Sequence, residues 1–137
     1  MAEESEQRKK DRLIKKMEKE RGYVYPAWLY MVDKDVDFME AYNNLYERGL
    51  TDGKALPAKT KEFIAIAILA FRGQEKAVYL HAKRALRLGA TKQELLEAME
   101  ATVIPGGALT FQAGLSALMR IEEDEKQAGN LKQESRA

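Results

Sequence analysis

Apolar residues recur every three to four positions along most of the chain, the spacing that places them on one face of a helix. Residues 36 to about 48 are one such stretch. No segment alternates apolar and polar residues over the length of a strand. The pattern therefore predicts an all-α fold, a compact bundle of about six or seven helices.

Residues 63–71 read FIAIAILAF and contain no polar side chain. The run is too uniform for a surface helix and far shorter than the roughly 20 apolar residues that cross a bilayer. We expect a buried central helix that starts near Pro57 and ends before Gly73. A helix that is apolar on all sides needs neighbours all round, so the run also favours a homo-oligomer.

The next helix is expected from about Gln74 to Leu88. His81 lies on its apolar face, whereas the cations Lys83, Arg84 and Arg87 are expected on the solvent face. Thr91 followed by Glu94 is typical of a capping box, in which the two side chains bond backbone N–H groups at a helix start. This pair predicts the beginning of the following helix.

We expect three regions along the chain. Residues 1–22 carry many charges and only a thin apolar stripe at Leu13, Ile14 and Met17, so they predict a helical arm with little surface to bury. Residues 23–127 form a helical domain, and residues 128–137 form a mobile polar tail.

Two segments of this domain are informative. Tyr23, Tyr25, Trp28 and Tyr30 concentrate the aromatic residues in one stretch, either as a packing plug or as the wall of a ligand pocket. A last helix from about residue 108 to 127 follows a break at 105–107 and is expected to pack through five apolar residues: Leu109, Phe111, Leu115, Leu118 and Met119.

The composition of the chain excludes several classes of function. The 137 residues fit one domain, and 23 basic against 22 acidic side chains give no electrostatic reason to expect nucleic acid or an anionic membrane as partner. The N-terminus lacks the apolar centre of a secretory signal, so we expect a cytoplasmic protein. The chain has no cysteine, which excludes disulfides, thiolate metal sites and thiol peroxidase chemistry.

His81 and Glu62 are the candidates for acid–base chemistry. His81 is the only histidine, and its side chain exchanges protons near neutral pH. The alternative for His81 is a core residue bonded to a carbonyl group, and the alternative for Glu62 is a pair with Lys59 or Lys61. One histidine and scattered carboxylates lack the spacing of a metal site, and no glycine-rich phosphate loop is present. We therefore expect no metal and no cofactor.

The segment from about Leu56 to Ala117, including FRGQEKAVYLHAKRALRLGAT, resembles the carboxymuconolactone decarboxylase family, which also contains alkylhydroperoxidase-D-like proteins. The peroxidase branch carries a glutamate ahead of Cys-x-x-Cys-x-x-x-His. Aligning that histidine with His81 puts Glu62 at the glutamate, and Gln74 and Ala77 at the cysteines. The resemblance thus implies the fold without the thiol chemistry.

The resemblance further implies a helical subunit that assembles as a trimer or hexamer, with a pocket near the helices of Glu62 and His81. It favours the decarboxylase branch, which converts a carboxylated muconolactone to an enol lactone and carbon dioxide without a cofactor. In such a reaction His81 would supply a proton, Glu62 would orient His81, and Gln74 would donate a hydrogen bond. A neighbouring subunit would supply the cation for the substrate carboxylate.

Two other functions are compatible with the same sequence. The chain could be a non-catalytic oligomeric protein that binds a small ligand in the same fold. It could also be a scaffold whose helical arm at residues 2–21 mediates assembly.

Overall fold

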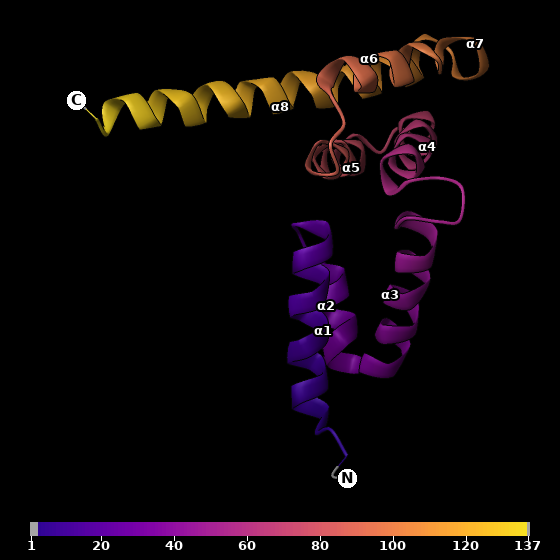
Figure 1. Ribbon diagram of the computed structural model, residues 1–137, viewed down its shortest axis with the longest axis vertical. Helices are drawn as coiled ribbons and strands as arrows, with labels where there is room; N and C mark the ends of the chain where they lie inside the picture. The colour runs from indigo at the N-terminus through magenta and orange to yellow at the C-terminus, as the bar shows by residue number, and fades with distance from the viewer. Residues whose placement is uncertain (1–2, 137) are drawn as a thin grey trace. The chain divides into compact units, whose positions relative to one another are not determined.

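A computed structural model describes residues 3–136, and within them every regular element is a helix, as expected. Eight helices are present there (Figure 1), more than the six or seven expected. The additional elements are a helix in the aromatic stretch and a short helix at the predicted break. The helices are α1 (Glu6–Arg21), α2 (Pro26–Lys34), α3 (Val36–Leu50), α4 (Ala58–Phe71), α5 (Glu75–Arg87), α6 (Lys92–Glu100), α7 (Val103–Gly106) and α8 (Ala108–Glu134).

The chain divides into two compact units, the first ending at Gly53 and the second starting at Lys54. This grouping differs from the expected boundary at residue 22, because α1 packs with α2 and α3 as part of the first unit. Each unit has a core of its own.

The first core is built from α1, α2 and α3. Leu13 and Met17 of α1 are fully buried with Val32, Val36 and Met39. The expectation that α1 has little to bury is therefore wrong: the stripe is thin, but α2 and α3 supply its apolar counterpart. Ser5 caps the start of α1, and Gly22 ends it with the positive φ of 71° that glycine adopts easily.

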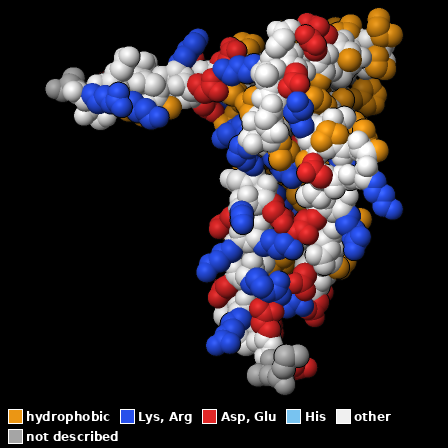
Figure 2. Space-filling view, viewed as in Figure 1, with side chains coloured by type: hydrophobic (Ala, Val, Ile, Leu, Met, Phe, Trp, Pro, Cys, Tyr) orange, Lys and Arg blue, Asp and Glu red, His pale blue; other side chains and the backbone are white. Residues whose placement is uncertain are grey.

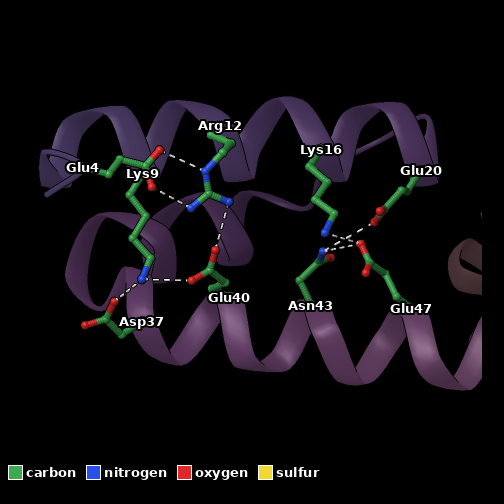
Figure 3. Close-up of polar contacts among 9 residues, drawn as sticks. All are labelled: Glu4, Lys9, Arg12, Lys16, Glu20, Asp37, Glu40, Asn43 and Glu47. Carbon is green, nitrogen blue, oxygen red and sulfur yellow. Dashed lines mark hydrogen bonds and ion pairs between the residues drawn. The ribbon is translucent and has the colours of Figure 1, made fainter. Parts of the chain in front are cut away.

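Charged side chains join α1 to α3 beside this core (Figure 3). Lys9 bridges Asp37 and Glu40, and Arg12 contacts Glu40 at 2.9 Å. Lys16 binds Glu47 at 2.7 Å further along the two helices. The charges that predicted a solvated arm thus pair α1 with its neighbour.

The aromatic stretch packs within the first unit. Trp28 lies 5.0 Å from Tyr42 between ring centroids, and Tyr25 meets Trp28 edge-on at 6.4 Å. The guanidinium of Arg21 covers the ring of Tyr46 at 3.8 Å. These contacts favour the packing role over a pocket wall for Tyr25 and Trp28.

The second core is formed by α4, α5, α6 and α8. Thr91 and Glu94 make the predicted capping box at the start of α6. Small residues let α8 approach its neighbours: its buried stripe includes Ala113, Gly114, Ala117 and Ile121. The expected stripe is wrong in part, since Leu109 and Met119 are exposed.

Two boundaries in the second unit differ from those expected. The helical turn α7 occupies part of the predicted break, and Gly107, with a φ of 81°, separates it from α8. Helix α8 continues to Glu134, so most of the expected tail is helical, while residue 137 lies outside the described residues. The expectation of mobility for this segment stays a prediction.

Candidate active site

Glu62 places a carboxylate inside the second core. It lies in the second turn of α4, on the buried stripe with Ala58, Ile66 and Ala70. The four residues are spaced four apart, which keeps them on one helix face. The side chain of Glu62 is completely buried, so its charge requires partners.

Two residues of α5 provide these partners. His81 and Arg84 are three positions apart, and therefore point to the same side of the helix. Nδ1 of His81 lies 2.6 Å from Oε2 of Glu62. Nη1 of Arg84 donates to Oε1 of the same carboxylate. Glu62 thus binds one partner with each oxygen, and we call the three residues the Glu62 cluster.

The cluster orients the imidazole ring of His81. The Arg84 guanidinium carries a permanent positive charge, and its bond to Oε1 pairs that charge with the Glu62 carboxylate. An ionised carboxylate only accepts hydrogen bonds, so Nδ1 of His81 carries the hydrogen that is donated to it. In the neutral ring Nε2 is then the proton acceptor. The orientation of His81 by Glu62 that the resemblance implies has a geometric basis here.

Solvent reaches one member of the cluster more than the others. The side chain of His81 is 21% exposed, whereas that of Arg84 is nearly buried. A partly exposed imidazole held by a buried carboxylate can exchange protons with a molecule at the surface. The arrangement differs from a core histidine bonded to a backbone carbonyl.

The burial of Arg84 differs from the distribution of charge expected on α5. The sequence predicts it on the solvent face with Lys83 and Arg87, yet it is buried. Three positions from His81 on a helix correspond to a rotation of only about 60° from the same face. The cost of burying the guanidinium is offset by its bond to Glu62. A cation three residues after His81, within reach of a buried acid on α4, is the signal that sequence reasoning missed.

Gln74 lies apart from the cluster. It precedes the first residue of α5, is exposed, and its amide donates to the carbonyl of Arg72 at 3.4 Å. It is seven residues before His81, about 10 Å along a helix axis. The two residues lie two helical turns apart, so a bound molecule would have to bridge this separation to contact both.

An apolar pocket of the second unit lies between α4, α7 and α8. It has a volume of about 290 Å³ and is lined by Ala67, Ile68, Phe71, Thr102, Pro105, Gly106 and Thr110. None of the three residues of the Glu62 cluster lines it. The pocket is therefore a feature separate from the cluster.

Two further findings concern metal binding and membrane insertion. Within residues 3–136 no three or more acidic or histidine side chains gather in a way that would hold a metal ion. None of the helices described is long and apolar enough to cross a membrane.

Two curated relatives are themselves uncharacterised proteins. One from Methanocaldococcus jannaschii is 30% identical over 89 residues, which span 65% of this chain and 82% of the relative. One from Cupriavidus necator is 35% identical over 69 residues, which span 50% of this chain and 60% of the relative. The names of these two relatives assign them no activity.

Two crystal structures share the fold. One, from Burkholderia xenovorans, carries a provisional assignment as a carboxymuconolactone decarboxylase. It has a TM-score of 0.75 and 22% identity over 92% of this chain and 98% of its own. The apo form of a carboxymuconolactone decarboxylase family protein from Legionella pneumophila has a TM-score of 0.64 and 26% identity, over 84% and 96% of the two chains.

The sequence itself matches the same family. The family model of carboxymuconolactone decarboxylases matches residues 37–119, more than half of the chain, and includes all three residues of the Glu62 cluster. The expected fold and resemblance are confirmed. The chain belongs to the carboxymuconolactone decarboxylase family.

Proposed function

We propose that this protein is a cofactor-free enzyme that performs acid–base chemistry, most simply decarboxylation, on a small carboxylated lactone or a related acid. The observation that carries the proposal is the Glu62 cluster. It combines a partly exposed imidazole with a buried carboxylate that sets which ring nitrogen accepts a proton. A thiol mechanism is excluded because the chain has no cysteine.

The chemistry of the proposed reaction matches this cluster. When carbon dioxide leaves, the electron pair of the broken carbon–carbon bond moves into the conjugated lactone, and negative charge develops on the carbonyl oxygen. A protonated His81 would then deliver a proton to carbon, and Glu62 would stabilise the imidazolium. Gln74 would donate to the developing oxyanion if the substrate reaches the start of α5.

The cation for the substrate carboxylate has to come from elsewhere. Arg84 already binds Glu62, so its charge serves the cluster. We propose, as the sequence suggested, that a neighbouring subunit supplies the cation.

Ultraviolet-monitored turnover of 4-carboxymuconolactone tests the proposal. We expect His81→Ala to lower kcat by about 10²–10⁴-fold. Lys83→Ala, which alters an exposed cation of the same helix, should keep full activity. Unchanged turnover in His81→Ala would remove His81 from the mechanism, and a wild-type protein without turnover would exclude this substrate.

A non-catalytic binding protein is the second candidate. The apolar pocket favours it, because Phe71 lines that pocket and the Glu62 cluster does not. Binding of a small apolar acid that shifts the NMR signals of Thr102 and Thr110 but not those of His81, without turnover, would support this candidate.

A further inference from the structure

Mostly apolar side chains flank His81 on its own helix. On α5, the positions three and four residues away share a side with His81. They are occupied by Ala77, Val78, Arg84 and Ala85. Arg84 is the one charged residue of this set, and its guanidinium is bonded to Glu62. The imidazole ring is therefore flanked on α5 by apolar side chains and by a cation that already has a partner.

Helix α4 adds no charge to these surroundings after Glu62. Residues 63–71 contain no charged side chain, and Figure 2 shows apolar side chains gathered around α4 and α7. The expectation that this helix is buried on all sides is wrong, because Ile64, Ile68 and Phe71 are exposed. Only the stripe that contains Glu62 is buried by the other helices.

The cation that precedes Glu62 on α4 is also engaged. Lys59, three residues before Glu62, binds Oε1 of Glu94 at 2.9 Å. The two cations that lie three residues from Glu62 or from His81 on their own helices, Lys59 and Arg84, thus both have carboxylate partners. These surroundings suit a neutral substrate better than one that needs a cation.

The ring of His81 presents a proton acceptor to such a molecule. Nδ1 lies 2.6 Å from Oε2 of the fully buried Glu62, so the part of the ring that solvent reaches lies on the side of Nε2. With the hydrogen on Nδ1, Nε2 of the neutral ring holds a lone pair. In this form the site takes up a proton, whereas the decarboxylation proposed above uses the protonated ring.

Proton transfer between two carbon atoms suits a single acceptor of this kind. In a β,γ-unsaturated γ-lactone, the α-carbon lies between the carbonyl group and the double bond. Its C–H bond is acidic because the electron pair that remains is delocalised over both groups. The proton can return to the γ-carbon on the same face of the ring, which brings the double bond into conjugation with the carbonyl group. One acid–base group therefore serves both steps.

We propose that His81 also isomerises neutral β,γ-unsaturated lactones to their α,β-unsaturated isomers. Nε2 takes the proton from the α-carbon as the C–H bond breaks, and the electron pair forms a dienolate. The imidazolium, stabilised by Glu62, then returns the proton to the γ-carbon, and no other reactant is consumed. The inference rests on the acid–base role proposed for His81 but not on decarboxylation, since this substrate has no carboxylate and needs no cation.

α-Angelica lactone, a neutral β,γ-unsaturated γ-lactone, tests the inference. Proton NMR with the full chain follows formation of the conjugated isomer, which should be faster than in buffer alone. We expect His81→Gln to lower kcat/KM by about 10²–10⁴-fold. The glutamine amide still donates to Glu62, so this variant should keep the wild-type circular dichroism spectrum. Lys83→Ala, which alters an exposed cation of the same helix, is the matched control and should keep the wild-type rate.

Three results would overturn the inference. They are a wild-type rate equal to that of buffer, a full rate in His81→Gln, and opening of the lactone to the keto acid in place of isomerisation. The last result would mean that His81 activates water and not a carbon acid.

Release of carbon dioxide from 4-carboxymuconolactone, measured separately on the same variants, distinguishes the two activities. Isomerisation without carbon dioxide release would refute decarboxylation and support this inference. Carbon dioxide release without isomerisation would do the reverse.

Discussion

Glu62 divides its two carboxylate oxygens between two partners of different chemistry. Oε1 accepts from the permanent cation Arg84, and Oε2 binds the titratable ring of His81. A permanent charge of this kind compensates a buried carboxylate that also orients an imidazole. The three side chains form one electrostatic unit, so each depends on the other two.

Removal of the Arg84 guanidinium should therefore lower the stability of the fold. We expect Arg84→Met to lower the free energy of unfolding by about 3–5 kcal/mol, because it leaves a buried carboxylate without its cation. The double variant Glu62→Leu with Arg84→Met should recover part of that loss. Urea denaturation at pH 7 measures both variants.

The control for this prediction lies one turn along α5. Arg87→Met changes an exposed guanidinium and should alter stability by no more than about 0.5 kcal/mol. A loss in Arg84→Met as small as that of the control would contradict the structural role assigned to Arg84.

Sequence reasoning identifies two members of this unit and places the third wrongly. Glu62 and His81 stand out because each is a polar residue on an apolar helix face. Arg84 does not, because a cation near other cations predicts a solvated face, and only the packing of α4 on α5 brings it to Glu62. Contacts between helices are not encoded in the periodicity of either helix alone.

At the scale of elements, α1 and α3 share a pair of carboxyl groups. Burial, followed by a hydrogen bond with Glu47, raises the pKa of Glu20 from its ordinary 4.5 to about 6. Hydrogen bonds from Glu20 and Lys16 lower the pKa of Glu47. Asn43 lies between them and reaches each carboxyl at 3.4 Å (Figure 3). The pair holds one proton more readily in the folded chain than in the unfolded chain.

This pair predicts a pH dependence with a definite sign. The folded pKa of Glu20 is the higher one, so its contribution to stability is complete below about 4.5 and is lost as the pH rises through about 6. Glu20→Gln keeps a hydrogen-bond donor at every pH. We expect this variant to show a smaller decline in stability between pH 4.5 and 6.5 than the wild type.

Urea denaturation at several pH values in this range measures the difference. Glu18→Gln, an exposed position on the same helix, is the control and should follow the wild-type curve. Parallel curves for the wild type and Glu20→Gln would show that the two carboxyl groups do not share a proton.

Helix α8 approaches α6 at Gly114. A Cβ atom at this position would lie 2.0 Å from Sδ and 2.5 Å from Cγ of Met99, which is buried. We expect Gly114→Ala to lower the free energy of unfolding by about 1–3 kcal/mol through overpacking. The additional substitution Met99→Ala should restore part of it by making room.

The same helix offers the matched control. A Cβ atom at Gly129 would meet no side chain within 4 Å, since the space around this glycine is open. Gly129→Ala should be neutral or stabilising by up to about 1 kcal/mol, because alanine favours the helix. Equal effects of the two substitutions, measured by chemical denaturation, would contradict the close approach at Gly114.

The elements themselves are largely predictable, for local reasons. Pro57, Thr91 and Glu94 mark helix starts through backbone chemistry that acts within a few residues. The buried stripe of α8 could not be predicted in the same way. Sequence reasoning expects large apolar residues to be buried, whereas the close packing of α8 on its neighbours buries the small residues Ala113, Gly114 and Ala117.

At the scale of the whole molecule, the two units have separate cores, and a single tryptophan allows the unfolding of one of them to be followed by fluorescence. Trp28 is the only tryptophan, and it packs in the first unit. Its fluorescence therefore reports on the first core, whereas far-ultraviolet circular dichroism reports on all helices. The division at Gly53 could not be predicted from composition, because charged residues continue on both sides of it.

This arrangement predicts different midpoints for the two probes. In Gly114→Ala, which weakens the second core, the transition followed by circular dichroism should shift to lower urea concentration more than that of Trp28 fluorescence. Coincident shifts would show instead that the two cores unfold as one cooperative unit.

The Glu62 cluster also constrains how this sequence can diverge. Substitution of Glu62 or Arg84 alone leaves the other as an unpaired buried charge, and loss of Glu62 also leaves the imidazole of His81 without the group that orients it. A sequence with only one of these substitutions would therefore be less stable or less active until a second substitution compensated. We expect lineages either to retain the three residues together or to replace Glu62 and Arg84 together with apolar residues. A relative that keeps His81 after such a joint replacement would have inherited the ring without the carboxylate that orients it.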